Sequence, residues 1–357
     1  MEDYNQLINK LGEAEKKSLK DVYEEKVKLL YEVWIEEIKI DAKHLELVNI
    51  CYNLFTKSTD VNHRTGYRVV LVDPLCTLGI KIFDLMLYHE ENQTAILLDA
   101  KSSISDRGTS GMVTDTSKAS EMAYNNKNKL EEFIGKPISK MEFVIVVPAY
   151  YAENLRDAIQ SKQANICVWA YFHDPSSLQL IQTVNEDVSA QRLNGRTHSD
   201  ENMRQILLKS VSAKMGALRS LPIMPTSHIF TKFEYLSQNL FVELDRLPQE
   251  KRWFEYSTVF SLLKRAYSAT EFDDSDIERE TKKLINSALN ARLFRKINNE
   301  EEIARSEFTV EYKRSSYEKF RQEYLDNRST DKAYSEAVSE FRRIKGISSL
   351  TDFPKET

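Results

Sequence analysis

Residues 79–103, GIKIFDLMLYHEENQTAILLDAKSS, decide the fold of this chain. Residues 79–88 are rich in β-branched and aromatic side chains and predict a strand. Residues 94–101 are so apolar that they predict a buried central strand. The polar residues 90–93 between them are typical of a turn, so the two strands predict a β-hairpin.

The hairpin brings two acidic side chains opposite each other. If the turn is centred between Glu91 and Asn92, Asp84 faces Asp99 across the strand pair. Facing residues of an antiparallel pair lie roughly 4.5–5.5 Å apart at Cα, so the two carboxylates could share one divalent cation. Side chains alternate along a strand, which puts Lys101 on the same face as Asp99. Charged groups at the end of an apolar hairpin are costly unless they bind something.

Asp84 with Asp99-Ala100-Lys101 resembles the motif of the PD-(D/E)xK nuclease superfamily. Phe83 stands where the motif name has proline, a position that the family keeps loosely. The tripeptide alone is a weak signal, because Asp41-Ala42-Lys43 repeats it. Most such copies lie in helical patterns, and none ends a buried strand paired to another acid. A merely structural charge cluster is the alternative interpretation.

The resemblance implies a catalytic metal centre. Asp84 and Asp99 would bind Mg²⁺, with the Ala100 carbonyl as a further ligand, because hard oxygen ligands suit this ion. Lys101 would orient the attacking water or stabilise negative charge on phosphorus. All four residues would thus belong to one active site.

Nucleases of the resembled family often add an acid from the helix before the hairpin. Residues 1–58 have helical periodicity throughout and predict a helical layer over the sheet. On it Glu46 is the best-placed candidate for a catalytic acid, with Glu36 or Glu37 as alternatives. Solvent exposure is the competing interpretation of Glu46.

The segments around the hairpin predict the rest of an α/β core, a restriction-endonuclease-like mixed sheet flanked by helices. A strand–helix–strand unit with a short crossover implies a parallel strand pair. The resulting order, helices, three strands, helix, strand, helix, strand, is that of the resembled family over roughly residues 40–175. The predicted elements are a strand at 67–75, a loop at 104–117, a helix at 117–134, a strand at 141–147, a helix at 151–161 and a strand at 165–172.

The C-terminal half predicts a second module. Residues 185–200 have the composition of a linker, and residues 201–219 predict a helix. Three helices followed by two strand-like runs then resemble a winged helix-turn-helix. The predicted domains are a nuclease domain with an N-terminal helical layer at 1–185, a linker and connecting helix at 186–222, a winged-helix DNA-binding domain at 223–313 and a C-terminal helical segment at 314–357.

The third helix of this module, predicted to be capped at Asp274 or Ser275, would enter the major groove. Its outward residues suit contacts with phosphates, guanine and adenine. Two glutamates on the helix dilute the positive charge, and a solvated face in a protein–protein module is the alternative. The DNA-binding candidates are Arg279, Lys282, Lys283 and Asn286.

The composition is that of an ordinary globular protein, with 41% hydrophobic and 29% charged residues. There is no apolar stretch of membrane-spanning length and no signal-like N-terminus, so we expect a cytoplasmic protein without a membrane partner. Cys51, Cys76 and Cys167 have no metal-binding spacing and predict reduced core residues. The net charge of −5 neither indicates nor excludes nucleic-acid binding, because a local basic face is what matters.

These features predict a Mg²⁺-dependent, site-specific DNA endonuclease, most like a type II restriction enzyme. One such centre cuts one strand, so cutting both strands of double-stranded DNA would require a homodimer. Two alternatives stay open. The first is another nuclease of the same superfamily, in repair, nicking or phage defence. The second is a catalytically inactive DNA-binding protein whose acid pair is structural.

Overall fold

The computed structural model divides the chain into two compact units. The sheet unit comprises Ile40–Tyr235 and Ser261–Glu278, and the terminal unit comprises Met1–Lys39, Leu236–Phe260 and Arg279–Thr357. The domain boundaries predicted from the sequence stay a prediction. The structure describes residues 2–56, 60–103, 108–173, 178–183, 198–208, 211–214, 221–244, 246, 248, 253–298, 300–310 and 317–345.

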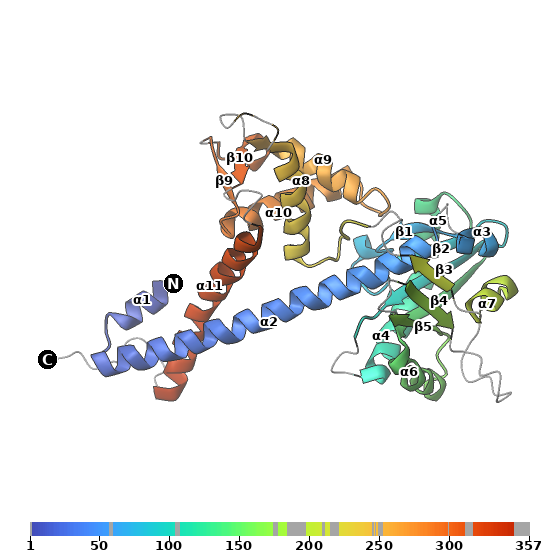
Figure 1. The fold of residues 1–357 in the computed structure, drawn as a ribbon, viewed down its shortest axis with the longest axis horizontal. Coiled ribbons are helices and arrows are strands. Elements are labelled where there is room, and N and C mark those ends of the chain that lie inside the picture. Colours follow the sequence, from blue (N-terminus) through green and yellow to red (C-terminus); the bar gives the residue numbers. More distant parts are fainter. Residues whose placement is uncertain are drawn as a thin grey trace. The chain divides into compact units, whose positions relative to one another are not determined.

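A mixed β-sheet forms the centre of the sheet unit, and its seven strands lie side by side in chain order. Figure 1 shows β1 to β5 next to one another. The pairs β3–β4 and β4–β5 are parallel and the others are antiparallel, which confirms the predicted mixed α/β class. The strands are β1 (Tyr67–Val72), β2 (Leu85–His89), β3 (Thr94–Ala100), β4 (Lys140–Pro148), β5 (Cys167–His173), β6 (Leu178–Thr183) and β7 (Val211–Lys214).

Helices cover both faces of this sheet. One face packs against the end of α2 (Glu13–Leu54), α3 (Asp60–Thr65) and α7 (Glu201–Leu208). The other face packs against α4 (Gly108–Asn125), α5 (Lys127–Ile134) and α6 (Ala149–Ser161). Every residue of β3 is buried, as its apolar sequence predicts for a strand that is covered on both sides.

The predicted hairpin is confirmed in its register. His89 pairs with Thr94 and Leu85 with Leu98, so the next positions along the same register are Asp84 and Asp99. The strand pairs end at Leu85 and Leu98, and just before β2 the Asp84 N–H donates to the Leu98 carbonyl at 2.8 Å, one residue out of that register. The turn therefore has the centre that the sequence analysis assigned to it.

Three predicted boundaries are wrong. β2 begins at Leu85 rather than at residue 79, because residues 76–78 form the short 3₁₀ helix η1 (Cys76–Leu78) and Gly79 has a left-handed φ of 80°. Residues 108–117 belong to α4 and not to a loop, because a buried stripe that includes Met112 and Thr116 packs them on the sheet despite their glycines. The sheet packing overrides the local signal in both places.

The third wrong boundary lies after the first five strands. The helix predicted over residues 201–219 ends at Leu208, and β7 follows, pairing with β6 at the edge of the sheet. Neither of these two strands was predicted. The predicted linker lies outside the described residues, apart from residues 198–200.

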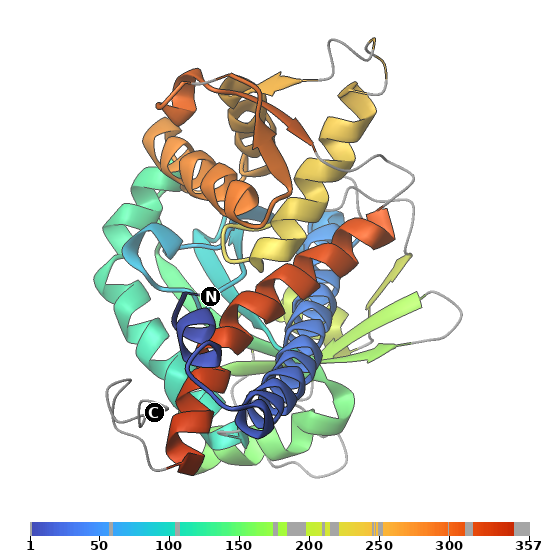
Figure 2. The same ribbon diagram turned by 90° about the vertical axis from the view of Figure 1, so that its left-hand side faces the viewer.

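The terminal unit contains long helices and a small sheet. α1 (Glu2–Ile8) lies beside α11 (Tyr317–Lys345), as Figure 2 shows, and the rings of Tyr4, Tyr23 and Tyr334 pack together there. Stacking of aromatic rings stabilises this contact. The small sheet has the order β8-β10-β9, and its strands are β8 (Phe254–Glu255), β9 (Phe294–Lys296) and β10 (Glu307–Val310).

Three helices each contribute residues to both units. The two strand-like runs predicted after the third helix correspond to β9 and β10, while the winged-helix fold and its DNA-binding role stay predictions. The third helix begins at Asp274, and the Asp273 carboxylate accepts the Asp276 N–H at 2.9 Å. The cap is therefore Asp273, one residue before the predicted positions. These helices are α8 (Ile229–Leu244), α9 (Tyr256–Ala266) and α10 (Asp274–Asn290).

A buried histidine fastens the chain before α7 to the sheet. Glu142 Oε2 lies 2.6 Å from His198 Nδ1, and Trp169 Nε1 donates to His198 Nε2 at 2.8 Å. The Ser199 hydroxyl and N–H also donate to Glu142 Oε1. Burial would raise the pKa of Glu142, but the bonds from His198 and Ser199 outweigh it and lower that pKa from 4.5 to about 2.

We expect the Glu142 contacts to make the folded state sensitive to acid. A carboxylate with a lowered folded pKa contributes stability above its unfolded pKa of 4.5, and this is lost as the pH falls through about 2. The contribution is on the order of 2 kcal/mol. Urea unfolding of the wild type and Glu142→Gln at pH 4.5 and below should show a steeper loss of stability in the wild type. Equal pH dependence in the two proteins would contradict this assignment.

Candidate active site

The structure brings Asp84, Asp99 and Lys101 together where β2 begins and β3 ends. Asp84 immediately precedes β2, Asp99 lies in β3, and Lys101 follows β3. Asp99 is fully buried and Asp84 is 5% exposed. Lys101 Nζ forms an ion pair with Asp99 Oδ1 at 2.5 Å. The three side chains that the sequence motif singled out are therefore neighbours in space.

Each carboxylate of the pair has two defined neighbours. Asp84 Oδ2 accepts the Ala100 N–H at 2.6 Å, and Asp84 Oδ1 lies 3.0 Å from His44 Nε2. Asp99 Oδ2 accepts the Thr116 hydroxyl of α4 at 2.9 Å, while its other oxygen faces the lysine. Groups from α2, β3 and α4 thus fix the orientation of both acids.

Two cations balance the formal charge of the two carboxylates. Burial disfavours the His44 imidazolium, but the attraction of Asp84 outweighs it and raises the pKa of His44 from 6.5 to about 9. Burial likewise disfavours the Lys101 ammonium, yet Asp99 and Asp84 hold the pKa of Lys101 above its ordinary value. Burial raises the pKa of Asp99 against the opposing effect of Lys101. His44 and Lys101 are consequently both charged at neutral pH.

The His44–Asp84 pair should make stability fall in mild alkali. A histidine with a raised folded pKa contributes stability below its unfolded pKa of 6.5, and this is lost as the pH rises through about 9. We expect a loss on the order of 1–2 kcal/mol, discounted because the His44 side chain is 29% exposed. Urea unfolding at pH 6.5 and 9 should show a smaller loss in His44→Gln, which keeps a donor for Asp84. Identical losses in both proteins would rule out the charged pair.

A third acid stands next to the pair. Val72 pairs with Leu85, so Asp73 is beside Asp84, and its N–H donates to the Asp84 carbonyl at 2.8 Å. Asp73 is buried, and its Oδ2 accepts the N–H and the hydroxyl of Thr226, each at 2.8 Å. Its Oδ1 has no hydrogen-bond partner within the described part of the chain. Burial, and then the charge of Asp84, raise the pKa of Asp73 to about 7.

The catalytic role predicted for an acid of the preceding helix stays a prediction. Glu46 is exposed, and it is His44, two residues earlier on α2, that reaches Asp84. Two residues correspond to a rotation of roughly 200° about a helix, so the two side chains leave α2 on different sides. Glu36 pairs with Lys39 at 3.6 Å within the terminal unit. Glu37, the other alternative, belongs to that unit as well.

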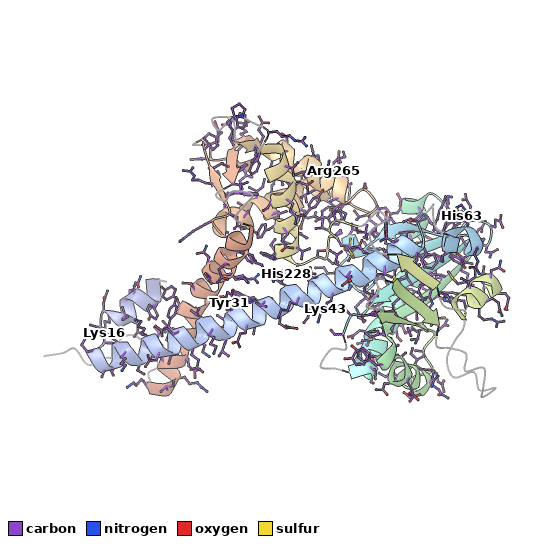
Figure 3. The ribbon with its side chains drawn as sticks, viewed as in Figure 1. Lys16, Tyr31, Lys43, His63, His228 and Arg265 are labelled. Carbon is purple, nitrogen blue, oxygen red and sulfur yellow. The ribbon has the colours of Figure 1, made fainter. Side chains whose placement is uncertain are left out.

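A chain segment after β7 holds the part of α2 that carries His44. The Leu221 N–H donates to Asn49 Oδ1 at 2.5 Å, and the Asn49 amide donates back to the Leu221 carbonyl at 3.2 Å. The N–H of His228, which lies close to α2 in Figure 3, donates to Asp41 Oδ1 at 2.9 Å. His44 lies between these two attachment points, so its approach to Asp84 is fixed on both sides.

Sequence reasoning missed three residues of this site: His44, Thr116 and Asp73. His44 shares a helical stripe with the buried Val48 and Cys51, a signal that was available because a polar residue on a buried stripe needs a partner. Thr116 was hidden by the wrong loop assignment. Asp73 lies within the strand predicted at 67–75, but its place beside Asp84 depends on a register that only the fold defines.

The carboxylate oxygens of Asp84 and Asp99 are ligands of the type that a hard cation such as Mg²⁺ prefers. Among the described residues, no three His, Cys, Asp or Glu side chains form a group that could hold a metal ion. Mg²⁺ binds through one or two carboxylates and keeps several waters, so Asp84 and Asp99 supply a sufficient set.

The four DNA-binding candidates lie on one helix and are exposed. Their exposure follows from the buried stripe of α10, which includes Ile277, Leu284 and Ile285. Lys283 pairs loosely with Glu280 at 3.8 Å. Contact with DNA stays a prediction for Arg279, Lys282, Lys283 and Asn286.

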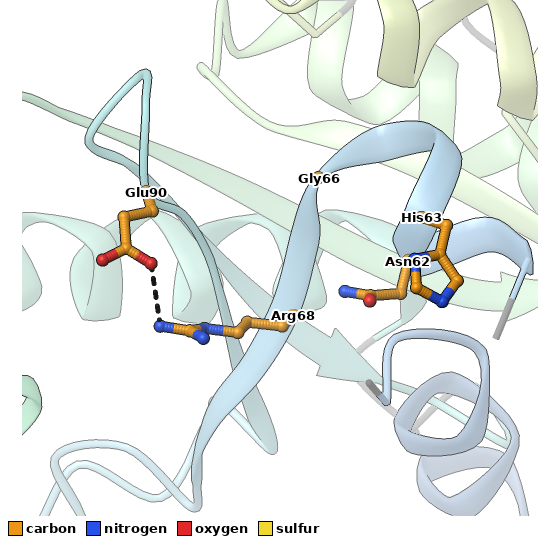
Figure 4. Close-up of a pocket in the computed structure, with 5 residues that line it drawn as sticks. All are labelled: Asn62, His63, Gly66, Arg68 and Glu90. Atoms are coloured by element: carbon orange, nitrogen blue, oxygen red, sulfur yellow. Dashed lines mark hydrogen bonds and ion pairs between the residues drawn. The ribbon is translucent and has the colours of Figure 1, made fainter. Parts of the chain in front are cut away.

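The described surface also contains a polar pocket of about 360 Å³ (Figure 4). Arg68 and Glu90 form an ion pair across it at 3.1 Å, so the charge of this arginine is already balanced. The pocket lies at the end of β1 and β2 that is far from Asp84. It is therefore separate from the acid pair. Its lining residues are Asn62, His63, Gly66, Arg68 and Glu90.

Comparison with known proteins does not identify a function for this chain. No protein-family model matches the chain, and no solved structure matches it. It is similar to an uncharacterised protein of Archaeoglobus fulgidus, with 22% identity over an alignment of 360 positions that covers 87% of this chain and 88% of that protein. None of the described helices combines the length and apolar character that a membrane span requires.

Proposed function

We propose that this protein is a Mg²⁺-dependent DNA endonuclease of the PD-(D/E)xK superfamily, of the type II restriction kind. The observation that supports the proposal is the grouping of Asp84 and Asp99 at the end of the hairpin, where Lys101 forms an ion pair with Asp99. Two buried carboxylates beside a half-buried ammonium are costly to maintain. A catalytic role explains why they are grouped at the end of an apolar hairpin.

Asp84 and Asp99 would hold Mg²⁺, and the Ala100 carbonyl is the third group proposed to bind it. When bound, the ion would screen the charge of the phosphate and lower the pKa of a bound water. Ala100 also orients the site through its N–H, which fixes one Asp84 oxygen. The hydroxyl of Thr116, on α4, likewise fixes one Asp99 oxygen.

Lys101 would orient the attacking water and stabilise the negative charge that develops on the phosphoryl oxygens. Its raised pKa keeps the ammonium charged at neutral pH, as this role requires. His44 adds a second positive charge beside Asp84 and could contact the same phosphate when Mg²⁺ occupies the carboxylate. Attack would proceed in line, with the 3′ oxygen as the leaving group.

DNA binding would involve the exposed face of α10, and cleavage of both strands would involve a homodimer. Lysine and arginine on this face suit phosphates and guanine, and asparagine suits adenine. One active site cuts one strand, so two copies related by a two-fold axis would cut a duplex. Both statements extend the proposal beyond the acid pair and are tested separately from it.

Plasmid digestion with and without Mg²⁺, followed by mapping of the ends, tests this function. Discrete fragments that appear only with Mg²⁺ would support a restriction enzyme. Mg²⁺-dependent smearing or nicking would instead favour a nuclease of loose specificity from the same superfamily. DNA binding without any cleavage would point to a non-catalytic DNA-binding protein.

A further inference from the structure

An exposed aromatic side chain stands beside the candidate active site. Tyr150, in the first turn of α6, is 72% exposed, the largest value among the large hydrophobic side chains of the described residues. Its ring centroid lies 4.1 Å from that of Tyr151. Burial of an aromatic ring is favourable, so a ring left this open on the rim of a site is available to a ligand.

Backbone pairing places Tyr150 close to Lys101. The Lys101 N–H donates to the Val146 carbonyl of β4 at 2.8 Å, and β4 ends two residues later at Pro148. Helix α6 begins with the next residue, so Tyr150 follows the backbone that holds Lys101 by only four positions. The strands β3, β4 and β5 are parallel, and ligands of such sheets bind at the carboxyl ends of the strands.

The surroundings of Tyr150 favour a base over a phosphate. Burial raises the pKa of the neighbouring Tyr171 to about 12, and the charges of Tyr150 and Glu46 contribute, so both lie within electrostatic reach of this strand residue. Glu46 is exposed. A carboxylate here repels a phosphate but leaves stacking on an aromatic ring unaffected.

We propose that Tyr150 is a stacking platform for a nucleobase that is flipped out of the duplex next to the scissile phosphate, so that DNA already unpaired at this position binds more tightly than an intact duplex. This inference rests on the proposed nuclease function. In an intact duplex both faces of each base are covered by neighbouring bases, so only an unpaired or flipped base offers a face to the ring. Stacking of this kind tolerates any base, because every base has a π-face.

Binding measured in EDTA tests this inference without any cleavage. We would use the full chain and compare, by fluorescence anisotropy, a short duplex, the same duplex with a central single-stranded gap, and the gapped duplex with abasic sites in the gap. We expect the wild type to favour gapped DNA, and Tyr150→Ala to bind it about 5- to 50-fold more weakly. Tyr150→Phe should retain the preference, since it keeps the ring. Phe133→Ala, which removes a 44% exposed ring on α5, should bind like the wild type.

Three outcomes would overturn the inference. They are equal binding of gapped DNA by the wild type and Tyr150→Ala, equal binding of the gaps with and without bases, and failure of the wild type to bind gapped DNA. Cleavage with Mg²⁺ is scored separately. A wild type that binds gapped DNA through Tyr150 but does not cut it contradicts only the nuclease proposal. A wild type that cuts DNA with no dependence on Tyr150 contradicts only the stacking inference.

Discussion

Replacement of Asp99 by asparagine is expected to reduce Mg²⁺-dependent DNA cleavage by about 10³-fold or more. Asp99 is fully buried, and the substitution removes its negative charge while leaving an oxygen that can still accept the Thr116 hydroxyl. The loss should therefore come from the reaction and not from misfolding. Cleavage rates with saturating enzyme, together with the melting temperature of both proteins, measure the two effects separately.

The matched control for this variant is Glu121→Gln, which neutralises an exposed acid on α4. It changes the net charge by the same amount but does not touch the acid pair. We expect it to cut DNA like the wild type. Full activity of a folded Asp99→Asn would show that the acid pair is structural.

Replacement of Lys101 by methionine is the second substitution with a large expected effect. The ammonium lies 2.5 Å from Asp99 and is proposed to stabilise charge on the phosphate, so cleavage should fall by about 10²- to 10³-fold. Methionine preserves most of the volume of the buried stem. DNA binding should change little, because other positively charged residues are proposed to contact the phosphates.

The sequence contains its own control for Lys101. Asp41-Ala42-Lys43 repeats the same tripeptide on α2, where Lys43 is exposed (Figure 3). Lys43→Met should therefore leave cleavage unchanged. If the two methionine variants lose activity equally, the loss reflects a change in surface charge and the proposed role of Lys101 is wrong.

The sequence predicted the hairpin because its signals are local. Strong apolar strands joined by a polar turn predict the register without knowledge of the rest of the chain, and the strand pairs from His89–Thr94 to Leu85–Leu98 follow it. The strand–helix–strand unit of β4, α6 and β5 was predicted for the same reason. Both depend on periodicity over a few residues and on a short connection.

The remaining features depend on contacts between segments that are distant in the chain. The strand β7 pairs at the sheet edge although its sequence continues a helical pattern from α7. His44 joins the site because α2 is held against the sheet by a segment that begins at Leu221. The contact of His44 with Asp84 depends on the rotation of this helix, which packing determines and local propensity does not.

Binding of Mn²⁺, a spectroscopic substitute for Mg²⁺, tests the central claim most directly. Anomalous diffraction from a crystal soaked in Mn²⁺ should give a peak between the carboxylates of Asp84 and Asp99, and the peak should vanish in the Asp84→Asn/Asp99→Asn double variant. Such a result would establish that the two acids jointly hold a divalent cation beside Lys101. A soaked crystal with Mn²⁺ bound elsewhere and none at this pair would contradict the account.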